Sequence, residues 1–146
     1  FDKSRVAENE FLTQIGTLSG NPVAAAAGLA TLNVLKQPGA YEKIHGNGQA
    51  LMDGFTEEFA KTGTRAKVVG EAPLFDVFFT GGDVRDYRSM IAGDRDMTLR
   101  FNQLIRQRGI FKGDSKFYIS MAHTEGDIKL TLDAVADALN ELNAAA

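Results

Sequence analysis

Cysteine is absent from the 146 residues of this chain, and only two histidines occur. Without cysteine there is no disulfide framework and no thiol to bind a metal or act as a nucleophile. Two isolated histidines argue against a zinc cluster, so no metal site is expected. The apolar runs all fall short of the roughly 18 residues that span a bilayer, and no basic-then-apolar leader opens the chain. These absences favour a cytoplasmic protein without a membrane span.

Positive charge is also sparse. Sixteen Lys and Arg residues against 19 Asp and Glu residues give a formal net charge of −3, without a block of basic residues. No nucleic-acid surface and no basic membrane patch is therefore expected, and the partners should be small molecules or protein. A hydrophobic fraction of 44% and a charged fraction of 24% are ordinary for a globular domain that buries a core.

Four stretches have the apolar spacing of helices. The second contains Gly46, Gly48 and Gly54, each of which weakens a helix by about 1 kcal/mol relative to alanine, so tertiary packing has to hold it. The last is the clearest, because Thr124 and Asp127 resemble a capping box at its start. The predicted helices cover about 22–35, about 40–61 with Gly63 as its stop, 84–108 with a break near Gly93, and the stretch after Thr124, where Ile128, Leu132, Val135, Leu139 and Leu142 repeat on one face.

Between the second and the last helix the apolar period changes to two in places, which is typical of strands. The order of elements predicts an α+β fold, in which a small, mostly antiparallel sheet is covered on one face by helices. The predicted strands are 66–69, 74–79 with Phe75, Val77 and Phe79 on one face, and 110–112 and 117–121, the last two as a hairpin around Gly113–Lys116.

Residues 15–28, with the sequence I-G-T-L-S-G-N-P-V-A-A-A-A-G, join a glycine-punctuated loop to a helix start. Asn21 is a favoured N-cap, and Pro22 fits the first helical position. Thr17 and Ser19 supply hydroxyls, and Gly16 and Gly20 permit close backbone approach to a ligand. The loop is predicted to hold an anion, with phosphate as the best candidate. The alternative is an ordinary helix start that binds nothing, with alanines that mark only close packing.

Other polar residues have simpler interpretations. His123 could polarise a substrate group, but an imidazole at a strand-to-helix turn more often bonds nearby backbone. Asp76 lies opposite the apolar face of its strand and is expected at a solvent-exposed edge. His45 is expected on a helix surface. The arginines between 85 and 108 are expected on a solvated face, with the alternative that one of them reaches a substrate carboxylate. The cluster Asp94–Asp96 is typical of a helix start, and no third ligand accompanies it to suggest a metal site.

The loop 16–22 and its alanine-rich helix resemble a motif of the class III, fold-type I pyridoxal-phosphate enzymes, most closely of the glutamate-1-semialdehyde 2,1-aminomutase branch. The resemblance implies that the chain is the C-terminal piece of a longer enzyme. Residues 1–36 would supply a cofactor-phosphate loop and an interface helix, and residues 37–146 the small C-terminal α+β domain of that fold. The other segments that carry the resemblance, in the same order, are 37–41, 70–80, 86–88, 108–111 and 120–128.

The resemblance also implies a cofactor, pyridoxal 5'-phosphate, in a full-length homodimer that acts on small amino and keto substrates. Gly16 and Thr17 would contact the cofactor phosphate across the dimer interface. The Schiff-base lysine and the aspartate that pairs with the pyridine nitrogen belong to the family's large domain and are expected upstream of Phe1. The chain therefore has no catalytic residue of its own and is expected to be inactive alone.

The predicted hairpin bears on the reaction type. The aminomutases carry a glutamate near the position of Ser115, and its absence here favours transfer of an amino group between an amino acid or amine and a keto or aldehyde acceptor. One alternative is the aminomutase reaction itself, an intramolecular amino transfer in tetrapyrrole synthesis. Another is a non-catalytic module for anion binding or dimerisation.

Overall fold

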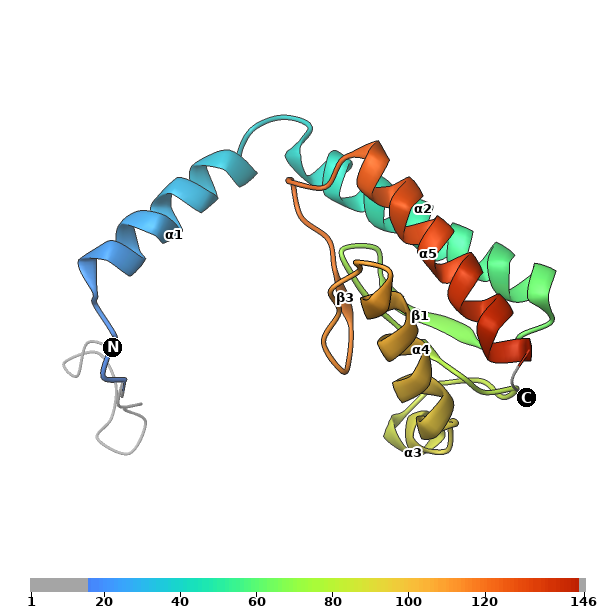
Figure 1. The fold of residues 1–146 in the computed structure, drawn as a ribbon. Helices are drawn as coiled ribbons and strands as arrows, with labels where there is room; N and C mark the ends of the chain where they lie inside the picture. Colours follow the sequence, from blue (N-terminus) through green and yellow to red (C-terminus); the bar gives the residue numbers. More distant parts are fainter. Residues whose placement is uncertain (1–15, 145–146) are drawn as a thin grey trace. The chain divides into compact units, whose positions relative to one another are not determined.

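The computed structural model describes residues 16–144, which belong to two compact units, Phe1–Pro38 and Gly39–Ala146. In the first unit a turn leads into helix α1 (Pro22–Leu35), drawn in blue in Figure 1. These bounds confirm the helix predicted over 22–35. None of its 14 residues is buried, and its sequence, P-V-A-A-A-A-G-L-A-T-L-N-V-L, contains no charged side chain. By itself, α1 therefore leaves a large apolar surface in water.

The second unit begins with helix α2 (Ala40–Thr62), which ends at Gly63 as predicted. Gly63 has φ +68°, in the left-handed region that glycine occupies without strain. Gly48 has a different task, because a Cβ atom there would lie 1.8 Å from the carbonyl oxygen of Ala72. The glycine thus lets the helix backbone touch the turn between the first two strands. The buried residues of α2 are Ala40, Ile44, Gly48, Leu51, Phe55 and Phe59.

The sheet has three antiparallel strands in the order β1 (Lys67–Glu71), β2 (Leu74–Phe78) and β3 (Phe117–Tyr118). Phe75 of the central strand pairs with Phe117, so both side chains point to the same face. On the other face Leu74 pairs with Tyr118, and both are exposed. The remaining helices are α3 (Tyr87–Ile91), α4 (Arg95–Gln107) and α5 (Glu125–Ala144). The expected α+β class, with helices on one face of a small antiparallel sheet, is confirmed.

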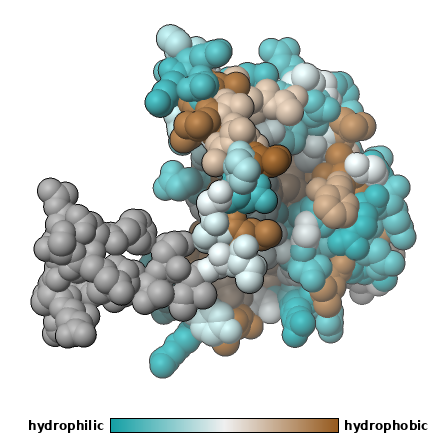
Figure 2. Space-filling model, turned by 90° about the vertical axis from the view of Figure 1, so that its left-hand side faces the viewer, coloured by the Kyte–Doolittle hydropathy of each residue, from teal (hydrophilic) through white to brown (hydrophobic). Residues whose placement is uncertain are grey.

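Aromatic rings join the helices to this sheet. Phe55 of α2 meets the rings of Phe75 and Phe117 edge-on, with centroids 5.7 and 5.1 Å apart, and Phe101 of α4 meets Phe79 at 5.4 Å. Figure 1 shows α2 and α5 side by side, and both contribute to one apolar core. Exposed apolar side chains also occur, brown among hydrophilic neighbours in Figure 2.

One predicted element is wrong. Residues 110–112 form no strand, and Phe117–Tyr118 pairs with β2 instead of completing a hairpin. The reason is that the side chain of Lys112 is buried and contacts Asp76 of β2, while Phe117 stacks on Phe75 with centroids 5.1 Å apart. Packing against the central strand therefore outweighs local hairpin pairing.

Candidate functional site

The loop before α1 consists of two overlapping turns. The Ser19 amide donates to the Gly16 carbonyl, and the Asn21 amide donates to the Leu18 carbonyl, each over 3.1 Å. Gly20 has φ +78°, a conformation that is strained for residues with a side chain. All residues from 16 to 21 are exposed, so a ligand can approach the loop.

The N-terminus of α1 is fully capped by Asn21. Its Oδ1 accepts from the amides of Val23 and Ala24 at 2.9 and 3.2 Å, and its carbonyl accepts from the amide of Ala25 at 2.9 Å. Pro22 has no N–H to offer. Because the donors of the first turn are engaged, the helix end can supply only its dipole to an anion. The loop itself would have to supply the hydrogen bonds.

Gly16 and Thr17 are the two predicted cofactor residues. A Cβ atom on Gly16 would lie 2.6 Å from Oγ of Ser19, so a larger residue there would require the exposed Ser19 side chain to rotate away. Thr17 lies in the turn with an exposed side chain. A hydroxyl in an exposed turn at the positive end of a helix suits phosphate, so these residues fit the group. Their contact with a cofactor remains a prediction.

A second polar site lies in the other unit, where β2 meets the segment after α4. Nζ of Lys112 lies 3.3 Å from Oδ1 of Asp76, and their side chains are 2% and 10% exposed. The expectation that Asp76 is solvent-exposed is wrong, because β2 is the central strand and Lys112 covers this carboxylate. The sequence gives little indication of this buried ion pair, because Lys112 is a single lysine after two apolar residues in a segment predicted to be a strand.

The charge on Lys112 is influenced by several groups. Burial lowers the pKa of its ammonium, and the nearby carboxylates of Asp76 and Asp114 oppose that effect without cancelling it. Arg106 lowers the pKa further. The ammonium also lies 5.0 Å from the centre of the Phe117 ring, a cation–π contact. Lys112 is thus a buried cation in a core that is otherwise largely apolar.

Helix α4 holds the same segment from the other side. Nδ2 of Asn102 donates to the Asp114 carbonyl at 3.2 Å, and Nη2 of Arg106 donates to the Lys112 carbonyl at 3.3 Å. Oδ1 of Asn102 is buried without a hydrogen-bond partner among the described residues. Asn102 was missed at the sequence level, because an asparagine among the apolar positions of a helix does not reveal its partner.

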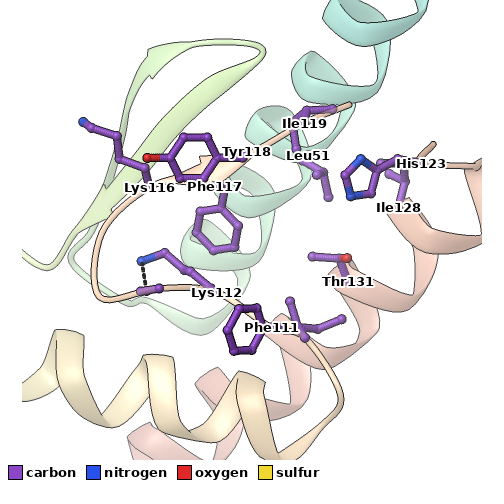
Figure 3. A pocket seen from close by; sticks show the side chains of 12 residues that line it. Leu51, Phe111, Lys112, Lys116, Phe117, Tyr118, Ile119, His123, Ile128 and Thr131 are labelled. Atoms are coloured by element: carbon purple, nitrogen blue, oxygen red, sulfur yellow. Dashed lines mark hydrogen bonds between the residues drawn. The ribbon is translucent and has the colours of Figure 1, made fainter. Parts of the chain in front are cut away.

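His123 borders a pocket of about 360 Å³ beside Phe117. Figure 3 shows His123 and Ile128 on one side of this pocket and Lys112, turned to the Gly113 carbonyl, on the other. The Ser120 amide donates to Nδ1 of His123 at 3.0 Å, which confirms the predicted bond to nearby backbone. His123 therefore serves the turn before α5.

The remaining candidates have structural roles. Oδ1 of Asp94 caps α4 by accepting from the Met97 amide at 2.9 Å, and Arg108 pairs with Glu141 at 2.8 Å. His45 is exposed, as expected. Over residues 16–144, no group of three or more His, Cys, Asp or Glu side chains could hold a metal ion. None of the helices described is long and apolar enough to cross a membrane.

Solved structures of transaminases contain a segment with the same fold as this chain. A β-phenylalanine aminotransferase from Variovorax paradoxus matches with a TM-score of 0.82 at 24% identity, over 98% of this chain and 33% of its own. A structure described as a transaminase with PLP bound matches with a TM-score of 0.76 at 24% identity, over 92% of this chain and 30% of that one. The chain therefore has the fold of one segment of the transaminases.

Among proteins with curated descriptions, the chain is similar in sequence to aminomutases. Glutamate-1-semialdehyde 2,1-aminomutase of Desulfatibacillum aliphaticivorans is 37% identical over 141 residues, which are 94% of this chain and 33% of that protein. The chain is a partial homologue of these aminomutases. It spans about a third of the length of the curated relatives that it matches. No family model matches the chain.

Proposed function

We propose that this chain is the C-terminal part of a cytoplasmic pyridoxal-phosphate enzyme that moves an amino group between an amino acid or amine and a keto or aldehyde acceptor. The observation that carries the proposal is the match to the aminomutases over 94% of the chain at 37% identity. Pyridoxal phosphate, when bound, supplies the electron sink for amino transfer. The Schiff-base lysine is expected upstream of Phe1, so this chain contributes binding and not the covalent step.

The proposal assigns Gly16 and Thr17 to the phosphate of the cofactor. The Thr17 hydroxyl provides a neutral donor, and the dipole of α1 favours a negative charge at this end. Asn21 already accepts hydrogen bonds from the amides of Val23 and Ala24. Thr17 therefore contributes more to phosphate binding than it would at an uncapped helix.

A homodimer is the second part of the proposal. Helix α1 has no charged residue and no buried one, and Val23, Leu29 and Leu32 are 76%, 63% and 52% exposed. A helix that is apolar on every side is stable only when other protein covers it. In the proposed dimer this cover also brings the Thr17 loop to the cofactor of the other subunit.

Amino transfer between two molecules is favoured over the aminomutase reaction because Ser115 stands near the position where the aminomutases carry a glutamate. The names of the curated relatives favour the aminomutase as the second candidate. The two reactions differ in stoichiometry, because only intermolecular transfer consumes an amino donor and a separate acceptor.

The experiment extends the polypeptide upstream of Phe1 along its coding sequence. The extended protein should form a borohydride-reducible adduct with pyridoxal phosphate on one lysine outside this chain, detected by peptide mass spectrometry, and should transfer an amino group between supplied substrates. Conversion of glutamate-1-semialdehyde without a second substrate would assign the aminomutase instead. A start codon directly before Phe1, together with no bound cofactor, would contradict the enzyme and favour the alternative of a non-catalytic module.

A further inference from the structure

Asn47 and Gly48 form the one Asn-Gly pair in the sequence. In a flexible chain this is the sequence in which asparagine loses its amide most readily, because glycine has no Cβ atom to obstruct the reaction. The backbone nitrogen of the glycine attacks the side-chain carbonyl carbon of the asparagine, and ammonia leaves as a cyclic succinimide forms. Water then opens the ring to aspartate or to isoaspartate, in which the backbone runs through the side chain. The pair is therefore a candidate site of covalent modification.

Helix α2 holds this pair in a geometry that does not react. Both residues lie inside the helix, which runs from Ala40 to Thr62. Ring closure requires a ψ angle of Asn47 far from the helical value, and a backbone nitrogen whose hydrogen is free. An amide in the interior of a helix instead donates to the carbonyl four residues earlier. The ring can therefore form only when this part of α2 opens.

The side chain of Asn47 is also engaged. Its Nδ2 donates to the carbonyl of His123 at 3.0 Å, in a half-buried position. One turn earlier, Nζ of Lys43 donates to the carbonyl of Met121 at 2.7 Å. These two bonds tie α2 to the turn before α5, which lies beside the start of α2 in Figure 1. The amide group that deamidation would remove thus makes a tertiary contact.

Neither product of the reaction fits the folded structure. An aspartate at position 47 has no side-chain N–H to donate, so a carboxylate oxygen would face the carbonyl oxygen of His123. An isoaspartate lengthens the backbone directly before Gly48. A Cβ atom on Gly48 would already lie 1.8 Å from the carbonyl oxygen of Ala72, so this part of the helix has no room for additional backbone atoms. Modification of the pair therefore opposes folding.

We propose that Asn47–Gly48 is a deamidation site that folding protects and unfolding exposes, so that a chain modified while unfolded no longer refolds. The inference does not depend on amino transfer, because the residues that carry it lie in α2 and in the turn before α5. Water is the one co-reactant, and the products are the modified chain and ammonia. The stability of the unit Gly39–Ala146 then sets the rate of this damage, because modification removes unfolded chains irreversibly.

Peptide mass spectrometry measures the protection. The full chain is incubated at mildly alkaline pH in native buffer and in concentrated urea, and conversion at Asn47 should be at least about tenfold faster in urea. Asn33 is the internal control, because it is exposed and precedes Val34, whose β-branched side chain obstructs the same attack. It should stay intact in both solutions. Equal rates at Asn47 in the two solutions, or no conversion in urea, would overturn the inference.

Two variants test the consequence for folding. Asn47→Asp reproduces the product that keeps the normal backbone, and it should lower the urea midpoint of unfolding. Asn140→Asp adds the same charge at an exposed position of α5 and should change the midpoint little. A midpoint of Asn47→Asp equal to that of wild type would contradict the proposed effect on folding.

Refolding connects the two results. Wild type kept in urea should regain less of its native circular dichroism on dilution, and the loss should match the fraction of chains modified at Asn47. Asn47→Gln has one more methylene and cannot form the five-membered ring, so it should refold equally well before and after the incubation. Full recovery of modified wild type, or an equal loss in Asn47→Gln, contradicts the proposal. If that variant does not fold, the peptide rates and the Asn47→Asp midpoint still decide.

Discussion

A single buried lysine shows how one residue can change the local topology. Lys112 lies in a segment with strand-like composition, but its ammonium is held against Asp76 and the Phe117 ring. A buried pair of this kind adds little stability, because desolvation of two charges offsets their attraction. Its main effect here is conformational, since it directs the segment across β2 and prevents the hairpin.

The pH dependence of stability should report this lysine. Burial lowers the pKa of Lys112 below its ordinary value of 10.5, so above the folded-state pKa and up to 10.5 the unfolded chain binds more protons than the folded one. The free energy of unfolding of wild type, relative to Lys112→Met, should therefore rise with pH across that window. Urea titrations of both proteins at a series of pH values, from about 8 to about 10.5, measure this difference in the free energy of unfolding. A difference that is flat or falls would contradict the lowered pKa.

At the scale of elements, glycines inside α2 have opposite roles. Gly46 is exposed, and a Cβ atom there would meet nothing within 4 Å. Gly48 is buried against the Ala72 carbonyl. Glycine in a helix is therefore an unneeded cost at one position and a packing requirement two residues later.

Two alanine substitutions test this difference. Gly46→Ala should raise the free energy of unfolding by up to about 1 kcal/mol, because alanine is the better helix former. Gly48→Ala should lower it, because the new methyl group forces α2 away from the turn between β1 and β2. Each variant is the control for the other in thermal and urea denaturation. A stabilised Gly48→Ala protein would disprove the close approach.

Helix α5 carries the apolar stripe that closes the core. Leu139 is fully buried, whereas Leu130 of the same helix is 54% exposed. Leu139→Ala should destabilise the protein by about 2–5 kcal/mol, the usual cost of such a truncation in a core. Leu130→Ala should change the urea midpoint little, because that side chain keeps half of its contact with water. Similar losses in both variants would argue against the assigned face of α5.

At the scale of the whole molecule, the two units differ in what they bury. The unit Gly39–Ala146 has a core of its own, built from its helices and sheet. The described part of the other unit buries no residue of α1. In the described part of this unit, the apolar side chains of α1 therefore face water, which is the observation behind the proposed dimer.

The proposed dimer makes a prediction for Thr17. A hydrogen bond to a charged group contributes roughly 1.5–3 kcal/mol, so Thr17→Val in the extended enzyme should weaken cofactor binding by about ten- to a hundredfold, with the fold unchanged by circular dichroism. Mixed dimers that pair a Thr17→Val subunit with a subunit lacking the catalytic lysine test the crossing of the interface. Their one lysine-bearing site should bind the cofactor normally. Binding as weak as in the Thr17→Val homodimer would show that Thr17 acts within its own subunit.

Local signals in the sequence determined most of the elements. Asn21 and Pro22 defined the start of α1, Gly63 the end of α2, and the capping box of Thr124 and Asp127 the start of α5, where Oδ2 of Asp127 accepts from the Thr124 amide at 2.7 Å. These signals are reliable because each one acts within a few residues. The alternation of apolar and other residues in β2 likewise predicted which face of the strand is buried.

Tertiary structure alone decided the rest. Burial of Asp76, the pairing of β3 with β2 and the clamp of Asn102 on the 113–116 loop all join residues that are distant in sequence. A period of two shows which side of a strand is apolar, but the neighbour that covers the other side depends on where the chain returns. A pocket lined by Arg95 and Asp114 exists for the same reason, because only the fold brings the two residues to one place.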